Sequence, residues 1–409
     1  MAGVAGLILL CVVVSLTPVN ACAQVDVQAQ NRAPETAEKP PVYMHYMPWF
    51  ETPETTGGKG WGVHWQMANC DPELVGEDGR RQIAAHFYPK IGPYASIDPR
   101  VIEYHFLLMR LCGIKGILID WYGVQGRNGD IESLLRNSNA IVDATERYGL
   151  EFAIVLEDQF ARSANDITVN VNWLQEYYFG RSNYIRVGEE NKPLLMVFGP
   201  QFAQQPEQWG SILNDLNEPV ALMPLWGESG DAGEYSSGEF AWVWENGDEN
   251  NHIEVLTRFL DREQAEGSIV AGSLYPGFVD FYEEGGAENR LAFEIPHDNG
   301  QTLRSVIDVY SADRLQRCDL IQAVTWNDFG EGTMFEPTIE TGFSYLVQLQ
   351  QFTGTGFDES DLELVHQLYL ARRKWADDQE KWSQLNEVSR LLRELKVDEA
   401  YELLYATID

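Results

Sequence analysis

The stretch LIQAVTWNDFGE, residues 320–331, decides the fold. It begins as a continuous apolar run and ends at Trp326 in a polar turn that carries two carboxylates, Asp328 and Glu331. A short apolar run without polar alternation is typical of a strand buried on both faces, as in a parallel sheet. Paired carboxylates beside an aromatic ring are what acid and base chemistry on a sugar needs. The same stretch is therefore the first candidate for an active site.

Seven further runs of this kind precede it, and stretches with helical spacing separate most of them. The strand runs are Val42–Met47, Gly116–Trp121, Glu151–Leu156, Pro193–Phe198, Val220–Leu225, Phe240–Trp244 and Ser268–Leu274. The helical stretches are Pro99–Leu111, Ile131–Tyr148, Val169–Tyr178, Pro206–Leu216, Ile253–Gln264 and Gln301–Leu315. Between the fifth and sixth runs the connection is too short and glycine-rich for a helix. Eight such units predict an α/β fold, a (β/α)8 TIM barrel with a C-terminal helical extension.

The chain divides into four expected parts. The first 19 residues lack charged side chains, and Gly6–Leu16 followed by a small-residue site at 21–23 predicts a signal peptide over residues 1–23. A lipoprotein signal to residue 21, with a lipid anchor on Cys22, is the alternative, and a buried N-terminal helix is a third. We expect a linker over 24–40, the barrel over 41–358 and a helical extension packed on the barrel over 359–409. Export implies a periplasmic, extracellular or outer-membrane-anchored location.

Composition bounds the possible partners. The 409 residues are 44% hydrophobic and 12% aromatic, which is enough for a packed core. The formal net charge of -34 repels polyanions, so nucleic acid and an anionic membrane surface are not expected partners. No segment after the N-terminal one is apolar enough to span a membrane. The oligomeric state is left open.

In a (β/α)8 barrel the chemistry lies at the C-terminal ends of the strands, and here these ends are rich in aromatic and acidic residues. Aromatic faces stack on sugar rings, and carboxylates accept bonds from hydroxyls. Each aromatic could instead close the barrel mouth, and Asp120 could be a buried structural acid. The candidates are Tyr46, Trp49, Asp120, Trp121, Tyr122, Glu157, Trp244, Tyr275, Trp326 and Asn327, with His64 and Trp65 in the first loop.

Motifs for other chemistries do not occur in the sequence. No glycine-rich phosphate loop of the GxGxxG or GxxxxGK[ST] type is present, and neither is a GxSxG nucleophile turn. The histidines are scattered without an HExxH pattern. The sequence therefore predicts an enzyme that uses no cofactor and no metal.

The candidate segments resemble, in chain order, the motifs of glycoside hydrolase family 99 and of the related family 71. WNDFGEGT at 326–333, with EP at 336–337, resembles the family signature W-N-E-W-x-E-G-T…E-P. The other matching segments are Tyr43–Trp49, HW at 64–65, DWYG at 120–123, Glu157 and YPGF at 275–278. They are similar to motifs at the first strand, the first loop, and the second, third and seventh strands.

The resemblance implies a (β/α)8 barrel and a retaining hydrolase of the endo-α-mannosidase and α-mannanase kind. It implies that Asp328 deprotonates the substrate's own 2-hydroxyl, which attacks the anomeric carbon to give a 1,2-anhydro sugar. It also implies that Glu331 protonates the leaving oxygen and then activates water. Neither role requires a metal.

One position departs from the family pattern, because Asp328 stands where the signature has glutamate. The shorter side chain withdraws the carboxylate by on the order of 1 Å. A misplacement of this size can cost ~100-fold in rate. Either the substrate sits deeper, or the mechanism differs, or Asp328 is not the base. Glu157 or Asp120 could then partner Glu331, at ~5–5.5 Å for retention or ~6.5–9.5 Å for inversion.

The sequence thus predicts an exported glycoside hydrolase that cleaves an α-linked oligosaccharide or polysaccharide, mannan-like or other, with retention. Two alternatives stay open: a glycosyltransferase-like relative with a similar motif, and a non-catalytic glycan-binding protein. The glycan, its linkage and endo or exo action are not fixed by the sequence.

Overall fold

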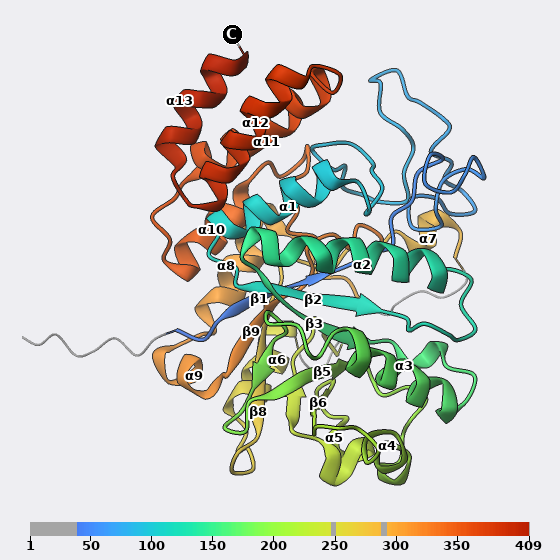
Figure 1. The fold of residues 1–409 in the computed structure, drawn as a ribbon. Coiled ribbons are helices and arrows are strands. Elements are labelled where there is room, and N and C mark those ends of the chain that lie inside the picture. The colour runs from blue at the N-terminus through green and yellow to red at the C-terminus, as the bar shows by residue number, and fades with distance from the viewer. Residues whose placement is uncertain (1–38, 247–250, 288–292, 409) are drawn as a thin grey trace, which may run out of the picture. The chain divides into compact units, whose positions relative to one another are not determined.

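Eight parallel strands form a barrel in the computed structural model, which describes residues 39–246, 251–287 and 293–408 (Figure 1). The predicted signal peptide and most of the predicted linker lie outside these residues. The barrel strands are β1 (Val42–Tyr46), β2 (Gly116–Trp121), β3 (Glu151–Leu156), β5 (Lys192–Val197), β6 (Ala221–Pro224), β7 (Gly238–Phe240), β8 (Ile269–Leu274) and β9 (Leu320–Ala323).

The strands pair in chain order, and the last pairs with the first. Val42 of β1 stands opposite Ile321 of β9, which joins the two ends of the barrel sequence. Between β6 and β7 the connection consists, in the described part of the chain, of two isolated bridges, Leu222–Ser236 and Leu225–Phe240. The predicted (β/α)8 fold is confirmed. A ninth strand, β4 (Arg186–Val187), pairs antiparallel with β5 and was not predicted.

Sequence explains why the strands can approach so closely. All six residues of β2 are buried, as expected for a strand covered on both faces. A Cβ on Gly116 would lie 2.2 Å from the backbone oxygen of Glu151, so only glycine allows β2 and β3 to pair at this point. The strand register that places Asp120 beside the end of β3 depends on this contact.

Helices cover the outside of the barrel. The first two, α1 (Pro99–Leu111) and α2 (Ile131–Tyr148), have the predicted bounds. Asp98 caps α1 by accepting from the backbone N–H of Arg100, and Gly149 ends α2 in the left-handed conformation at φ 64°. The others are α3 (Ala164–Tyr177), α4 (Pro206–Leu213), α5 (Ser229–Ala232), α6 (His252–Asp261), α7 (Tyr282–Gly285), α8 (Gln301–Asp308), α9 (Ala312–Arg317) and α10 (Ser344–Thr353), with 3-10 turns η2 (Asp158–Phe160), η3 (Gly233–Tyr235) and η4 (Asp298–Gly300).

Two helix predictions need correction. The stretch Gln301–Leu315 is two helices rather than one, because Ser311 accepts from the backbone N–H of Arg314 and begins α9 as a new helix. The connection between the fifth and sixth strands does contain a helix, α5, but it has only four residues.

The C-terminal extension consists of α11 (Glu359–Lys374), α12 (Gln379–Arg393) and α13 (Val397–Ile408), drawn in red beside α1 in Figure 1. Asp358 and Asp361 form a capping box at the start of α11. Arg372 of α11 donates to both carboxylate oxygens of Glu103 on α1, at 2.8 and 2.9 Å. Both side chains are buried, so this ion pair joins the extension to the barrel. In the described residues no helix has the length and apolarity needed to cross a membrane.

Candidate active site

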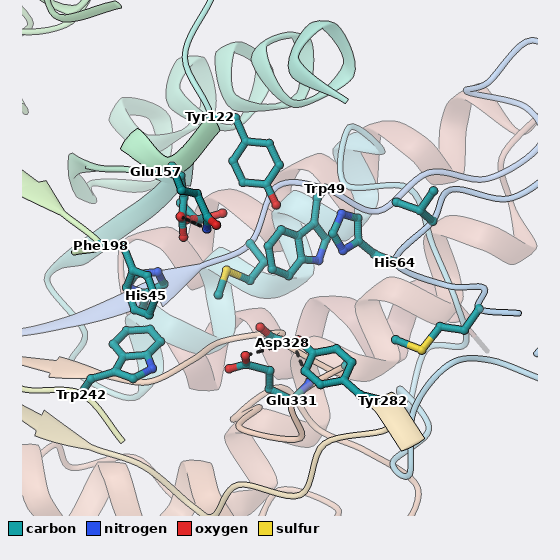
Figure 2. Close-up of a pocket in the computed structure, with 16 residues that line it drawn as sticks. His45, Trp49, His64, Tyr122, Glu157, Phe198, Trp242, Tyr282, Asp328 and Glu331 are labelled. Atoms are coloured by element: carbon teal, nitrogen blue, oxygen red, sulfur yellow. Dashed lines mark hydrogen bonds between the residues drawn. The ribbon is translucent and has the colours of Figure 1, made fainter. Parts of the chain in front are cut away.

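A pocket of about 380 Å³ opens at the C-terminal ends of the barrel strands (Figure 2). Figure 2 shows Asp328 and Glu331 on one side of it and Glu157 on the other. Asp120 also lines the pocket. No lysine or arginine is among the lining residues that the structure describes. The full lining is His45, Met47, Trp49, Val63, His64, Met67, Asp120, Tyr122, Glu157, Gln159, Phe198, Trp242, Tyr282, Asp328, Gly330 and Glu331.

The turn after β9 fixes the first carboxyl pair. The hydroxyl of Thr325 accepts from the backbone N–H of Asp328 at 2.8 Å, and Asp328 Oδ1 accepts from the backbone N–H of Glu331 at 2.9 Å. The backbone N–H of Thr325 donates to the backbone oxygen of Thr333 at 3.0 Å, which closes the turn behind them. Both carboxyls therefore leave the same rigid loop, and the hydroxyl of Tyr282 donates to Glu331 Oε1 at 3.3 Å.

The environment of these two carboxyls separates their proton affinities. Burial raises the pKa of Asp328 to about 6, and backbone N–H groups of Glu331 and Gly330 partly offset that rise because they stabilise the carboxylate. Burial and then the charge of Asp328 raise the pKa of Glu331 well above its usual range. Asp328 therefore ionises first, while Glu331 keeps its proton. An acceptor and a donor of protons thus stand three residues apart.

The second pair comes from neighbouring strands, since Asp120 is on β2 and Glu157 follows β3. Their carboxyl groups share a side-chain hydrogen bond. Burial, then the charge of Glu157, raises the pKa of Asp120 well above its usual range, and burial raises that of Glu157 to about 7. Gln159 donates to Glu157 Oε2 at 2.6 Å, which favours ionisation of this residue. Asp120 Oδ2 is buried, and it has no hydrogen-bond donor apart from the Glu157 carboxyl in the described residues.

Aromatic side chains line the two ends of the pocket. Near the first loop, the rings of Trp49 and His64 stack at 4.1 Å with an interplanar angle of 3°. At the other end, Trp242 meets His45 edge-on at 4.8 Å and Phe198 at 4.9 Å. Burial lowers the pKa of His45 to about 3, so this imidazole is neutral. The pocket therefore combines carboxyls in its middle with apolar rings at its ends, as a sugar site requires.

The structure brings seven of the predicted residues into this pocket: Asp328, Glu331, Asp120, Glu157, Trp49, His64 and Tyr122. The remaining predicted contacts lie outside the pocket, and strand geometry explains some of them. Neighbours in a strand point to opposite faces, so Asp120 and Trp121 cannot both face the pocket. Trp121 instead stacks on Trp173 of α3 at 5.7 Å.

The same alternation moves Tyr46 behind the pocket, and Trp326, which follows the end of β9 at Ala323, does not line the pocket either. Tyr46 and the Nδ1 atom of His105 are 2.8 Å apart, and the ring of Trp326 meets that of His105 edge-on at 5.2 Å. Asn327 holds the backbone of Met47 through its side-chain amide, accepting from N–H and donating to C=O at 2.9 Å each. Asn327 therefore joins the turn that carries Asp328 and Glu331 to the end of β1, and it does not line the pocket.

Three further predictions also need correction. Trp65 is fully buried and donates to the backbone oxygen of Tyr94 at 2.7 Å. Tyr275 is buried beside His252, with its hydroxyl 3.1 Å from the ring Nδ1. Trp244 is 44% exposed but contacts Phe293 outside the pocket, because the strand ends at Phe240 and not at residue 244.

Several lining residues were not predicted. His45 and Met47 alternate with Tyr46, so the period of a strand could have indicated them. Phe198 ends its predicted strand and could have been found in the same way. Trp242 follows the end of β7 at Phe240, where the strand period no longer applies. Tyr282 and Met67 come from long connections whose course follows no local pattern. The remaining ones are Val63, Gln159 and Gly330.

The barrel and its acid-lined pocket define a class of protein, the (β/α)8 glycoside hydrolases. Residues 39–220 match the model of glycosyl hydrolase family 99. A human glycoprotein endo-alpha-1,2-mannosidase-like protein is 24% identical over 337 residues, covering 73% of this chain and 68% of its own length. The glycoprotein endo-alpha-1,2-mannosidase of Xenopus laevis is also 24% identical, with 73% and 70% covered.

A solved structure shows the same fold. The family 99 endo-alpha-mannosidase from Bacteroides thetaiotaomicron aligns with a TM-score of 0.60 at 17% identity, covering 76% of this chain and 96% of that one. The resemblance to glycoside hydrolase family 99 is thereby confirmed, and the chain is a glycoside hydrolase related to that family.

Proposed function

We propose that the protein is an exported, retaining hydrolase of α-linked, mannan-like glycans. The observation that carries the proposal is the placement of Asp328 and Glu331 on one hydrogen-bonded turn that faces the pocket, and the separation of their pKa values supports it. The curated relatives named endo-alpha-1,2-mannosidases support the choice of an α-linked, mannose-containing substrate.

The chemistry proceeds in two balanced steps. In the first, Asp328 accepts the proton of the substrate's 2-hydroxyl, and that oxygen attacks the anomeric carbon while the glycosidic bond breaks. Glu331 gives its proton to the departing oxygen, which leaves a 1,2-anhydro sugar and an ionised Glu331. In the second, Glu331 accepts a proton from water as the water opens the three-membered ring at the anomeric carbon. Asp328 then returns its proton to the 2-oxygen, and two inversions give net retention.

Asp328, which is shorter than the glutamate of the family signature, can act as the base if the sugar binds closer to the turn. The backbone N–H of Glu331 holds Asp328 Oδ1, so one carboxylate oxygen is fixed and the other is left for the substrate. The Asp120 and Glu157 pair also lines the pocket and can exchange hydrogen bonds with sugar hydroxyls.

Export is part of the proposal and is supported by the sequence of residues 1–23 alone. The mature protein then begins after the small-residue site, in a periplasmic or extracellular setting, or carries a lipid on Cys22. Mass determination of the N-terminal peptide from the producing organism tests this point. An intact Met1 would contradict it.

Glu331→Gln tests the proposed acid. The amide cannot donate a proton to the leaving oxygen, so kcat on an α-mannan falls by about 10²–10⁴-fold while oligosaccharide binding is retained. We expect kcat of the Asp328→Asn variant to fall by a similar factor. Glu254→Gln, at an exposed position on α6, serves as a matched control with unchanged activity. Undiminished activity of Glu331→Gln would contradict the assignment.

The wild-type reaction tests the wider proposal. NMR of the first product from a panel of α-linked polysaccharides gives the α-anomer if configuration is retained. The β-anomer would overturn retention. Glycan binding without turnover by any member of the panel would indicate a binding protein instead.

A further inference from the structure

A second pocket, of about 700 Å³, lies between the C-terminal extension and the loop that leads into α1. Residues of three separate segments line it, and none of them belongs to the active-site pocket. Those that the argument uses are Thr52, Glu54, Tyr94, Tyr369, Arg373 and Trp382.

Trp382 of α12 is a fixed platform in this pocket. The guanidinium of Arg372 lies 4.5 Å from the centroid of its ring. Arg372 is itself held by the two bonds to Glu103 and by one to Asn386 Oδ1 at 2.8 Å. The ring is therefore positioned before any ligand arrives, which lowers the entropy cost of stacking on it.

Polar groups surround the platform. Arg373 is exposed, lies 5.9 Å over the ring of Tyr369, and has no carboxylate partner in the described part of the chain. Arg100 is held by Asp98 through two hydrogen bonds, of 3.0 Å to Oδ1 and 2.6 Å to Oδ2. Across the pocket, Thr52 and the exposed Glu54 come from the first loop. An aromatic face with hydroxyl, guanidinium and carboxylate groups around it is suited to a carbohydrate.

Charge favours a neutral sugar over an anion. The two arginines in the pocket are balanced by Glu54 and Asp98, and the protein as a whole has a formal net charge of -34. An anionic ligand would meet carboxylates in the pocket and repulsion on approach.

The pocket is also connected to the catalytic turn. Thr52, Glu54 and Thr55 line it, and residues 63–64 of the same loop line the active site. Tyr94 lies at its wall, and the Tyr94 hydroxyl donates to Glu336 Oε2 at 2.6 Å and accepts from Asn327 at 3.1 Å. Asn327 directly precedes Asp328, so the two pockets share one loop and one buried network.

We propose that this pocket is an accessory glycan-binding site, in which Trp382 stacks on a neutral sugar of the polysaccharide whose scissile bond lies in the active site. The proposal rests on the proposed function, since both pockets are taken to hold one glycan. It assigns the C-terminal extension a role in holding long substrates.

The test compares Trp382→Ala with Trp375→Ala, a matched control on the same extension. Trp375 contacts Lys374 and Lys381 and does not line the pocket. Steady-state kinetics are measured on an α-mannan and on an aryl α-mannobioside too short to reach the second pocket. For Trp382→Ala we expect KM for the mannan to rise by about 3- to 10-fold, from the worth of one aromatic stack. The kinetics on the short substrate stay unchanged, as do both activities of Trp375→Ala.

An unchanged KM for the mannan, or equal losses on both substrates, would overturn the accessory site. Because Trp382→Ala also removes the contact with Arg372, the exposed Arg373→Gln provides a second variant that leaves the fold intact. We expect it to change KM for the mannan in the same direction and to leave the short substrate unaffected.

Failure of the proposed function would be visible separately. If the wild-type enzyme cleaves neither substrate, calorimetric titration of wild type and Trp382→Ala with mannan oligosaccharides still tests the second pocket. Loss of one binding event in the variant supports the site, and identical isotherms reject it.

Discussion

Four carboxyls within one pocket, three of them buried and that of Glu331 partly buried, are the main chemical fact at the scale of single residues. Each resists ionisation because burial disfavours charge, and the described lining holds no lysine or arginine to compensate. What distinguishes them is local. Backbone N–H groups stabilise the ionised form of Asp328, whereas Glu331 faces the charge that results.

The pH dependence of turnover follows from this difference. In the proposed mechanism, activity needs ionised Asp328, whose pKa is raised to about 6, so we expect kcat/KM to fall as pH drops below that value. It also needs protonated Glu331, so kcat/KM falls again at a pH well above the usual range of a carboxyl. A pH profile on a short aryl substrate should be bell-shaped. An acid limb that stays near the ordinary pKa of aspartate would contradict the raised value.

The four acids could be identified from the sequence, but the other side chains that line the pocket could not all be identified in this way. Asp328, Glu331, Asp120 and Glu157 follow apolar runs, and strand ends of a barrel meet at one face. To tell which aromatic residues line the pocket, one must know the direction in which each side chain points. Period-two alternation separates Asp120 from Trp121 once the strand is fixed. It could not place Tyr282, whose connection is set by contacts distant in sequence, such as that with Glu331.

At the scale of elements, the C-terminal extension is held to the barrel by apolar side chains of the common core and by one buried ion pair. Strand and helix types were predictable because continuous apolar runs alternate with amphipathic ones. The ends were less so, since a cap such as Ser311 can begin a new helix inside a helical pattern. The pairing of α11 with α1 through Arg372 and Glu103 left no signal in the sequence, because the two residues are 269 positions apart.

Arg372→Met tests that pair. The change leaves the Glu103 carboxylate buried without its partner, which costs about 3–5 kcal/mol and lowers Tm by roughly 5–10 °C. Thermal unfolding followed by circular dichroism measures the loss. Replacing Glu103 by Met as well should restore much of it, since no unpaired charge remains. Arg373→Met, one position along and exposed, should leave Tm unchanged. Equal Tm for Arg372→Met and wild type would show that the pair is not needed.

The whole molecule carries 63 acidic against 29 basic residues, so its charges repel one another in the folded state. Raising NaCl from ~10 mM to ~150 mM shortens the screening length from ~30 Å to ~8 Å and weakens that repulsion. We expect Tm to rise by a few degrees over this range and to level off beyond it. KCl should act like NaCl, because screening depends on ionic strength alone. A Tm that is constant or falls with salt would contradict this account.

The bonds between Asn327 and Met47 have a consequence for biosynthesis. They join residues 280 positions apart, and β1 pairs with β9 across a similar interval. A nascent chain that stops before residue 320 already contains Asp120 and Glu157, yet it exposes the unpaired edges of β1 and β8. Such a fragment is a template for aggregation rather than a smaller enzyme. Catalytic competence therefore arises only when the last strand of the barrel meets the first.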